Sequence, residues 1–335
     1  MSRIAVIGAG LSGLVAARAL ARAHDVSVFE KSRGVGGRMA TRYAGRFEFD
    51  HGAQFFTARS ARFRRFLEPW LISGAIRPWN ARFVELRRDR VSKRRDWHAG
   101  WPHFVGAPRM NALCHALADG LDLRLETRVA TLGDGPPWRL ADAAGRPLGE
   151  YDWIVSTAPA PQTAQLLPAD SPLVRFADTA GMQACYALML GFDDAPDLPW
   201  QAARVLETDI SWISVNSSKP GRSDAFTLVV HSSNAWAEAH VEDDEHAVRA
   251  HLAAELHAVA GVDAGAAAHA ALQRWRYANL PTREAGPAFV DRERQLAACG
   301  DWAIRGRVEA AYRAAADMLE QLEPVLAGVT TGATD

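Results

Sequence analysis

A glycine-rich turn near the N-terminus constrains this chain more than any other feature. The apolar run Ile4–Ile7 is typical of a buried parallel strand, and the segment IGAGLSG that follows has G-x-G-x-x-G spacing. In such a turn Gly8 allows the tight bend, Gly10 lets a pyrophosphate approach the backbone, and Gly13 lets the next helix pack closely on the strand. The pattern predicts a dinucleotide-binding unit.

The residues after the turn complete a strand, helix, strand order. A helix is expected from Leu11 to about Arg22, and its N-terminus presents free N–H groups and a positive dipole end to phosphates. Val26–Glu30 is predicted as a second strand that ends in an acid about 20 residues past the glycines, where a carboxylate can accept both ribose hydroxyls. The alternative is a glycine-containing turn without a ligand, and the full order of elements favours dinucleotide binding.

Composition excludes some functions. The chain has 335 residues, which exceeds one ordinary domain, so two lobes are expected. A net charge of −1 gives no general attraction to nucleic acid or to an anionic membrane. Residues 59–95 nevertheless carry twelve Arg or Lys against three acids. We interpret this run as a solvated face, with a cationic wall for a phosphate-bearing substrate as the alternative.

Cysteine usage and hydropathy indicate a cytoplasmic protein. Cys114, Cys185 and Cys299 are isolated, without C-x-x-C or metal-binding spacing, as expected of reduced thiols. No apolar, charge-free stretch reaches the ~18 residues that a membrane span needs, and no signal peptide is expected before the first strand. The C-terminal residues 326–335 are expected to form a polar tail.

A second glycine cluster indicates which dinucleotide binds. Residues 32–42, SRGVGGRMATR, intervene where a plain NAD-binding fold would begin its crossover helix. The two clusters together resemble the signature of the flavoprotein group that includes amine oxidases, protoporphyrinogen oxidases, carotenoid desaturases and renalases. The resemblance implies FAD, with the second cluster along its pyrophosphate and Arg38 near the phosphates. A surface loop is the alternative for this cluster.

The C-terminal part carries a third such segment. A short strand, Leu296–Cys299, is followed by Gly300-Asp301 and by a helix expected from Arg305 to about Leu322. This resembles the C-terminal FAD motif of the group, which implies an Asp301 carboxylate near the ribityl or pyrophosphate region and a helix N-terminus aimed at the flavin. Asp301 as a simple helix cap is the alternative. Ala314-Ala315 departs from the Ser-Gly that many relatives have.

Several segments resemble bacterial renalase-type proteins over nearly the whole chain. They are DHGAQFFTAR (50–59), WPHFVGAPRMNAL (101–113), SWISVNSSKPGR (211–222), RWRYA (274–278) and GDW (300–302). The resemblance implies an FAD-dependent oxidase. It would transfer a hydride from 2- or 6-dihydronicotinamide dinucleotides to flavin N5 and pass the electrons to O2 as H2O2. Arg109 departs from the Gly that commonly precedes the Met.

Flavin amine oxidation is the second interpretation. Such enzymes commonly place a Lys near flavin N5, and this chain has three lysines: Lys31 after the ribose acid, Lys93 in an arginine run, and Lys219 in a Ser-Ser-Lys-Pro-Gly turn. None lies on an evident strand facing a flavin. The Ser-Gly-Gly-Cys-Tyr attachment segment of monoamine oxidases is missing, so FAD is expected to bind non-covalently.

The candidate site residues fall into two groups. Hydride transfer from a dihydropyridine removes no N–H or O–H proton, so stacking and orienting groups suffice, and each such group could equally be a core residue. Trp275 and Tyr277 share one face of a predicted strand, and Tyr186, Asn216 and His231 come from neighbouring strands. The cofactor-binding residues implied by the resemblance are Gly8, Gly10, Leu11, Ser12, Gly13, Glu30, Lys31, Gly37, Arg38, Met39, Gln54, Phe55, Val129, Gly300, Asp301, Arg307 and Val308.

The expected fold is α/β, a Rossmann-type FAD-binding lobe with an interleaved α+β substrate lobe on a mostly antiparallel sheet. Residues 1–60, 105–165 and 290–325 are assigned to the FAD lobe, and 61–104 and 166–289 to the substrate lobe. A flavin-binding redox sensor or structural flavoprotein, and an NADPH-dependent reductase, remain alternatives. No second G-x-G-x-x-G unit supports the reductase.

Overall fold

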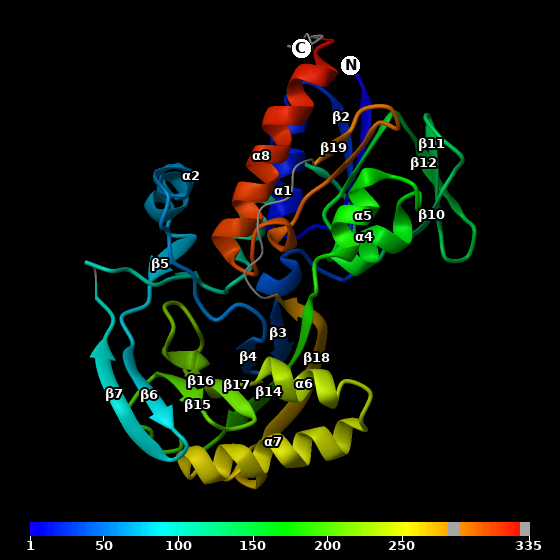
Figure 1. Ribbon diagram of the computed structural model, residues 1–335. Helices are drawn as coiled ribbons and strands as arrows, with labels where there is room; N and C mark the ends of the chain where they lie inside the picture. The colour runs from blue at the N-terminus through cyan, green and yellow to red at the C-terminus, as the bar shows by residue number, and fades with distance from the viewer. Residues whose placement is uncertain (99, 281–288, 329–335) are drawn as a thin grey trace. The chain divides into compact units, whose positions relative to one another are not determined.

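The structure is a computed structural model that describes residues 1–98, 100–280 and 289–328 (Figure 1). It divides into two compact units, which we describe separately. Unit 1 contains residues 1–37, 114–182 and 280–335, and unit 2 contains residues 38–113 and 183–279. Residues 38–60 and 105–113 therefore belong to unit 2, although they are expected in the FAD lobe from the sequence. Residues 166–182 belong to unit 1, and most of the expected polar tail lies outside the described residues.

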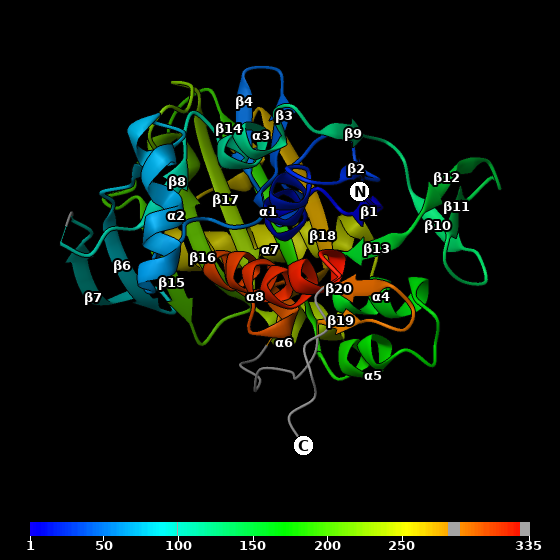
Figure 2. The same ribbon diagram turned by 90° about the horizontal axis from the view of Figure 1, so that it is seen from above.

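Unit 1 is built on a six-stranded sheet with the order β19-β20-β13-β1-β2-β9. All neighbouring strands are parallel except β19 and β20. Helix α8 runs beside α1 (Figures 1 and 2). The sheet strands are β1 (Arg3–Ile7), β2 (Asp25–Phe29), β9 (Asp122–Arg124), β13 (Trp153–Ser156), β19 (Val290–Asp291) and β20 (Leu296–Ala298). The other elements are α1 (Leu11–Leu20), α4 (Ala160–Leu166), α5 (Pro172–Asp178), α8 (Val308–Leu326), and a small sheet of β10 (Val129–Leu132), β11 (Trp138–Asp142) and β12 (Pro147–Tyr151).

Unit 2 is built on a seven-stranded sheet with the order β18-β14-β17-β16-β15-β6-β7, in which only β15 and β6 pair in parallel. Its strands are β6 (Arg82–Arg87), β7 (Arg90–Asp96), β14 (Gln183–Phe192), β15 (Ala202–Leu206), β16 (Ile210–Val215), β17 (Phe226–Ser232) and β18 (His269–Asn279). The other elements are β3 (Thr41–Ala44), β4 (Phe47–Asp50), β5 (Ile76–Pro78), β8 (Phe104–Gly106), α2 (Ala61–Ile72), α6 (Asn234–Ala239) and α7 (Glu245–Ala260); α3 (Ala112–Ala118) begins at the boundary with unit 1.

The two faces of the unit 2 sheet bury different partners. Helix α7 lies across one face (Figures 1 and 2), where its Leu252 and Leu256 pack with Leu188 and Val230 in the main core of the unit. Side chains alternate along a strand, so the neighbouring residues point to the other face. There Met189 and Val229 pack against the phenylalanines of β4 in a second cluster. The expected fold class is confirmed: a parallel Rossmann-type sheet and an interleaved, mostly antiparallel sheet.

Several predicted elements need correction. The sequence of residues 123–132 predicts one strand, and this prediction is wrong. The structure has two strands of different sheets there, β9 and β10, because the chain turns between them at Glu126, whose φ is 51°. Helix α8 begins at Val308 rather than Arg305, since Arg307 is extended, and it continues to Leu326. Ser60 precedes an amphipathic segment, so the sequence predicts that it caps a helix. This cap of α2 is confirmed, because Ser60 Oγ accepts a hydrogen bond from Phe63 N at 3.2 Å.

Strand β7 explains part of the basic run. All seven of its residues are exposed, and it forms the edge of the sheet beside β6. Charged side chains on an edge strand prevent pairing with a second chain. The structure therefore supports a solvated face for this segment. Among the described residues, no helix is both long and apolar enough to cross a membrane.

Candidate functional site

The first glycine turn of unit 1 has the geometry that its sequence predicts. Gly8 has a φ of +108°, and its N–H donates to the carbonyl of Phe29 at 2.8 Å. A Cβ on Gly13 would lie 2.0 Å from the Gly8 carbonyl oxygen, so only glycine allows α1 to start this close to β1. A Cβ on Gly10, by contrast, would have no atom within 4 Å. Backbone atoms therefore crowd the turn at Gly13, whereas the space next to Gly10 is free.

The second glycine cluster lies against this turn. Gly36 N donates to the Ala9 carbonyl at 2.9 Å, and Gly10 and Gly36 form a parallel bridge. A Cβ on Gly37 would lie 3.4 Å from the Gly10 Cα. Two backbone segments without side chains thus run together where α1 begins, and they form a cradle that fits a pyrophosphate.

Glu30 lies directly after β2 and is 7% exposed. Its carboxylate accepts hydrogen bonds from Ala9 N at 2.9 Å and from Ser32 N at 2.8 Å, which join the two glycine segments. A carboxylate has four acceptor positions, so these two bonds leave capacity for the ribose hydroxyls. The next residue, Lys31, is exposed and donates to Gln162 Oε1 at 3.2 Å.

The C-terminal segment of unit 1 reaches the same helix end. Ser12 Oγ, in the first turn of α1, donates to the Ala311 carbonyl of α8 at 2.8 Å. Gly300 is tight against Trp302, since a Cβ there would lie 2.4 Å from the indole nitrogen. Asp301 is 6% exposed in a short 3-10 turn before α8. The other predicted cofactor residues of unit 1 lie as follows: Leu11 and Val129 are buried, and Arg307 and Val308 form the N-terminus of α8.

The remaining predicted cofactor residues belong to unit 2. Arg38 Nη1 donates to the Ala278 carbonyl at 3.1 Å, and Met39 is buried in the 3-10 turn Gly37–Met39. The Gln54 side chain accepts from Ser214 Oγ at 2.7 Å. Phe55 packs among the rings of Trp97, His103 and Trp212, with ring centroids 4.7, 5.1 and 5.3 Å away. Gln54 and Phe55 therefore have established partners within unit 2.

A buried charge network centred on Asp50 dominates the polar interior of unit 2. The side chains of Asp50 and Lys219 are 0% exposed, and that of Arg222 is 1% exposed. Asp50 Oδ2 accepts from Lys219 Nζ at 3.2 Å and from Arg222 Nη2 at 2.5 Å. Its other oxygen accepts from Thr41 Oγ1 at 2.8 Å and from Met110 N at 3.1 Å.

Lys219 has two further acceptors, Asn216 Oδ1 at 2.9 Å and Gln54 Oε1 at 3.1 Å. Burial lowers the pKa of Lys219 to about 8, although the Asp50 carboxylate opposes this shift. Burial alone would raise the pKa of Asp50, but the charges of Lys219 and Arg222 and their hydrogen bonds lower it to about 2. The carboxylate is therefore ionised between two cations.

The network draws its members from three segments that are far apart in the sequence. Asp50 and Gln54 come from residues 50–59, Met110 from 101–113, and Asn216, Lys219 and Arg222 from 211–222. The sequence does not reveal this network directly, because Lys219 lies in a Ser-Ser-Lys-Pro-Gly turn, which is typical of an exposed residue. The available signal was the opposite charge of Asp50 in residues 50–59 and of Lys219 and Arg222 in residues 211–222. Arg109, the family departure, instead pairs with Glu48, with its Nε 3.0 Å from Glu48 Oε1.

The structure separates the predicted pocket residues. Trp275 pairs with Cys185 and His231 with Ala187, so Trp275, Tyr277 and His231 share one face of the sheet. The Trp275 ring stacks on His51 at 5.1 Å, and its Nε1 donates to the His51 carbonyl at 2.9 Å. Burial and the charge of Lys219 lower the pKa of His231 to about 4, so this imidazole is neutral at pH 7.

Two predicted pocket residues have other roles. Tyr186 lies on the opposite face, in the core under α7, and its hydroxyl donates to the His240 carbonyl at 2.9 Å. The grouping of Tyr186 with Trp275 is therefore wrong. Asn216 is 0% exposed, and besides Lys219 its side chain contacts the Glu48 carbonyl at 2.9 Å, so it is a member of the Asp50 network.

Aromatic side chains gather near His231. Trp212 pairs with His231 across β16 and β17, and it stacks on Trp97 at 6.3 Å. The Nε1 atoms of Trp97 and Trp212 are buried without a hydrogen-bond partner in the described part of the chain. Buried donors without partners are costly, so they mark a place where an acceptor can bind.

Comparison with known proteins identifies the family. Residues 6–70 match the NAD(P)-binding Rossmann-like domain, and residues 80–319 match the flavin containing amine oxidoreductases. The chain belongs to the flavin containing amine oxidoreductase family. It is therefore a flavin-dependent oxidoreductase. The glycine cradle and Glu30 of unit 1 fit the dinucleotide part of such a cofactor, because they offer open backbone N–H groups and one carboxylate.

Solved structures share the fold. A putative protoporphyrinogen oxidase from Exiguobacterium sp. 255-15 has a TM-score of 0.75 and 15% identity, covering 96% of this chain and 98% of that chain. Cyclohexylamine oxidase from Brevibacterium oxydans IH-35A has a TM-score of 0.66 and 14% identity, covering 96% and 99%. The 4,4'-diapophytoene desaturase of Staphylococcus aureus is 51% identical over 51 residues, which are 15% of this chain and 10% of that protein. The chain thus spans a tenth of the length of these curated relatives.

Proposed function

We propose that this protein is an FAD-dependent oxidase of dihydronicotinamide isomers, the 2- or 6-dihydro forms of NAD(P). In the net reaction, one dihydronicotinamide, one proton and one O2 give one NAD(P)+ and one H2O2. The observation that carries this proposal is the shared face of Trp275, Tyr277 and His231, together with the buried network that joins the renalase-like segments.

The residues of unit 1 are proposed to hold FAD without a covalent bond. The cradle of Gly10 and Gly36 receives the pyrophosphate, the N-terminus of α1 offers its N–H groups, and Glu30 accepts the ribose hydroxyls. Bound FAD supplies a hydride acceptor. Three buried cysteines without disulfide partners support a location in the reducing cytoplasm.

The side chains of unit 2 are proposed to bind and orient the substrate ring. Planar rings such as Trp275 stack on a dihydropyridine and limit its orientations. The oxidised nicotinamide carries a positive charge that the dihydropyridine lacks. A neutral His231 tolerates that charge, whereas a protonated imidazole would oppose it, and the lowered pKa keeps His231 neutral. The unpartnered indole N–H groups of Trp97 and Trp212 suit the oxygen of a carboxamide.

Stopped-flow flavin reduction tests the substrate. Under anaerobic conditions, 2- and 6-dihydronicotinamide dinucleotides should bleach the flavin much faster than primary amines do. Trp275→Ala should slow this reduction ~3–10-fold and leave the flavin spectrum nearly unchanged, because lost stacking is worth only about 0.5–1.5 kcal/mol. Trp275→Phe, which keeps a ring, should recover most of the rate. Rapid bleaching by a simple amine and none by the dihydropyridines would overturn the proposal.

The control is Trp101→Ala, which removes an indole of the same unit that is 62% exposed. The flavin of this variant should be reduced at the wild-type rate. Equal slowing in both variants would mean that Trp275 acts only through general destabilisation. Bleaching by none of these donors would favour a redox sensor that uses FAD without turnover.

Non-covalent binding has its own test. Acid precipitation of the yellow protein should release all the flavin into the supernatant, because the attachment segment of the covalent enzymes is absent from the sequence. Chromatography of the released flavin should show FAD rather than FMN. Colour that remains in the protein pellet would contradict the prediction.

Amine oxidation is the second candidate, and Lys219 favours it. This amine is buried, and its pKa of about 8 lies near neutral pH, where a lysine can exchange a proton. Its three acceptors Asp50, Gln54 and Asn216 nevertheless match the three N–H donors of a protonated amine, which favours a structural role. The same stopped-flow comparison decides between the two candidates.

A further inference from the structure

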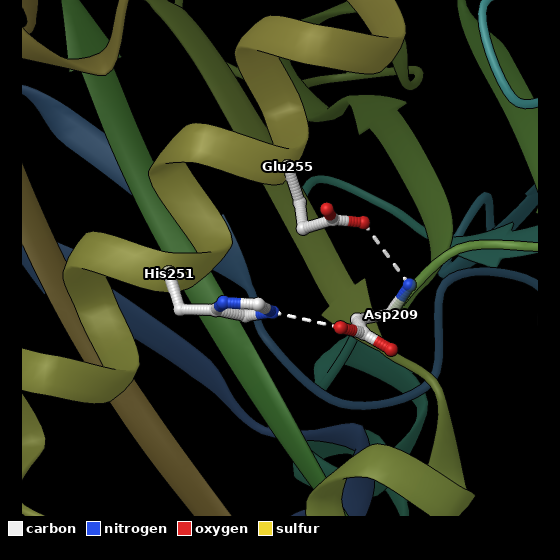
Figure 3. Close-up of side chains that lie close together, drawn as sticks. All are labelled: Asp209, His251 and Glu255. Carbon is white, nitrogen blue, oxygen red and sulfur yellow. Dashed lines mark hydrogen bonds and ion pairs between the residues drawn. The ribbon is translucent and has the colours of Figure 1, made fainter.

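A second polar cluster lies in unit 2 beside α7. It consists of Asp209, His251 and Glu255, and Figure 3 shows the three side chains pointing toward one another. Asp209 lies in the turn between β15 and β16, whereas His251 and Glu255 lie on α7. We propose that this cluster binds a divalent transition-metal ion of the Zn²⁺ class.

The helix provides two of the three ligands by its periodicity. His251 and Glu255 are four residues apart, so their side chains lie on one face of α7, one turn apart. The pair can therefore chelate one ion. The third ligand, Asp209, comes from the turn between β15 and β16.

The distances between donor atoms suit one small ion. One atom from each residue lies within 4.8 Å of the other two, and His251 Nε2 is 2.9 Å from Asp209 Oδ2. Ligand atoms about 2.1 Å from a tetrahedral ion are about 3.4 Å apart. Small side-chain rotations therefore bring all three atoms into coordination distance.

Contacts with neighbouring residues and one backbone hydrogen bond within the cluster hold the ligands in place. The His251 ring stacks on Trp236 with an interplanar angle of 6° and a centroid distance of 4.7 Å, which fixes its plane. The Asp209 carbonyl accepts from Ser233 N at 2.7 Å, and Asp209 N donates to Glu255 Oε2 at 3.1 Å. Preorganised ligands of this kind lower the entropy cost of binding an ion.

The surroundings favour a cation and leave room for water. Asp209 and Glu255 line a surface hollow that is also lined by Asp89, Glu207 and Arg88. Glu207 pairs with Arg87, which leaves three carboxylates beside the Arg88 guanidinium. One imidazole nitrogen with two carboxylate oxygens is a donor set for Zn²⁺ and its neighbours, whereas Ca²⁺ and Mg²⁺ prefer oxygen alone. Three protein ligands leave the fourth position of a tetrahedral ion to water.

Titration of the chelator-treated holoprotein with Zn²⁺ by calorimetry tests the proposal. We expect one Zn²⁺ per chain with a dissociation constant below about 100 μM, and a rise in the thermal unfolding midpoint when Zn²⁺ is added. His251→Gln should weaken binding by roughly a hundredfold and abolish the rise. Glu255→Gln should weaken binding as well, and its amide oxygen can still accept from Asp209 N, so the local fold is kept.

The matched control is His257→Gln, an exposed histidine on the same helix outside the cluster. It should bind Zn²⁺ like the wild type. The proposal is overturned if the wild type binds no Zn²⁺ in this range, or if His251→Gln and Glu255→Gln both keep wild-type affinity. An equal loss of Zn²⁺ affinity in His257→Gln would also overturn the proposal, since the ion would then bind elsewhere on α7. Flavin reduction by dihydropyridines does not depend on this outcome, so the two proposals fail separately.

Discussion

Asp50→Asn lowers the free energy of unfolding by about 3–5 kcal/mol, because it leaves two buried cations without a carboxylate. Lys219 and Arg222 both bind Asp50 Oδ2, and their side chains are buried. The asparagine keeps the size of the side chain and can still accept from Thr41 and Met110 N. The loss of unfolding free energy therefore measures the contribution of the negative charge of Asp50. Urea unfolding of the holoprotein, followed by tryptophan fluorescence, measures it.

The control removes an exposed ion pair in the same unit. Asp193 pairs with Arg46, and their side chains are 65% and 59% exposed. Asp193→Asn should cost at most about 1 kcal/mol, as expected of a surface pair. Similar losses in the two variants would mean that burial does not strengthen the Asp50 network.

Acid unfolding gives the same prediction a second readout. The pKa of Asp50 is about 2 in the fold and 3.8 for an ordinary aspartate. A depressed pKa contributes stability above the unfolded value, and that stability is lost as pH falls from about 4 to about 2. The wild type should lose stability steeply in this window. The free energy of unfolding of Asp50→Asn should be lower than that of the wild type at neutral pH, and it should decrease less steeply between pH 4 and pH 2.

Glu30→Ala loses roughly 2–4 kcal/mol of FAD affinity, because it removes charge-assisted hydrogen bonds and leaves polar partners unpaired. The Glu30 carboxylate also joins the two glycine segments by accepting hydrogen bonds from Ala9 N and Ser32 N, and the variant loses both of these bonds. Fluorescence titration of the apoprotein with FAD should show binding roughly 30- to 800-fold weaker.

Asp25→Ala is the matched control, because it removes an exposed acid from the other end of β2. This variant should bind FAD like the wild type. If Glu30→Ala instead purifies folded with a full complement of FAD, the role assigned to Glu30 is wrong.

The sequence predicts unit 1 well because its information is local. A buried strand, three glycines and an acid at fixed spacing determine the turn, and Gly8, Gly13 and Glu30 have the contacts that this spacing requires. The helix cap at Ser60 is local in the same sense. The break between β9 and β10 at Glu126 could not be predicted, because glutamate is not a residue type that favours a left-handed conformation.

The sequence predicts the site of unit 2 poorly because its information is not local. Lys219 lies in a turn, as expected, yet it is buried because Asp50, 169 residues away along the chain, comes to the same point. Tyr186 and Trp275 both lie on strands, and only the pairing register of β14 with β18 places them on opposite faces. Sequence alone gives no such register.

The strand order of unit 1 has a consequence for synthesis on the ribosome. Strand β13, beside the first strand made, begins at residue 153, and its next neighbour, β20, begins at residue 296. At about 5–20 residues per second, roughly 15 to 60 seconds separate translation of the glycine turn from that of β20. Until residue 153 is made, one edge of β1 has no partner strand, and until residue 296 is made, one edge of β13 has none. Chaperone dependence should therefore be greatest for chains that stall before residue 296.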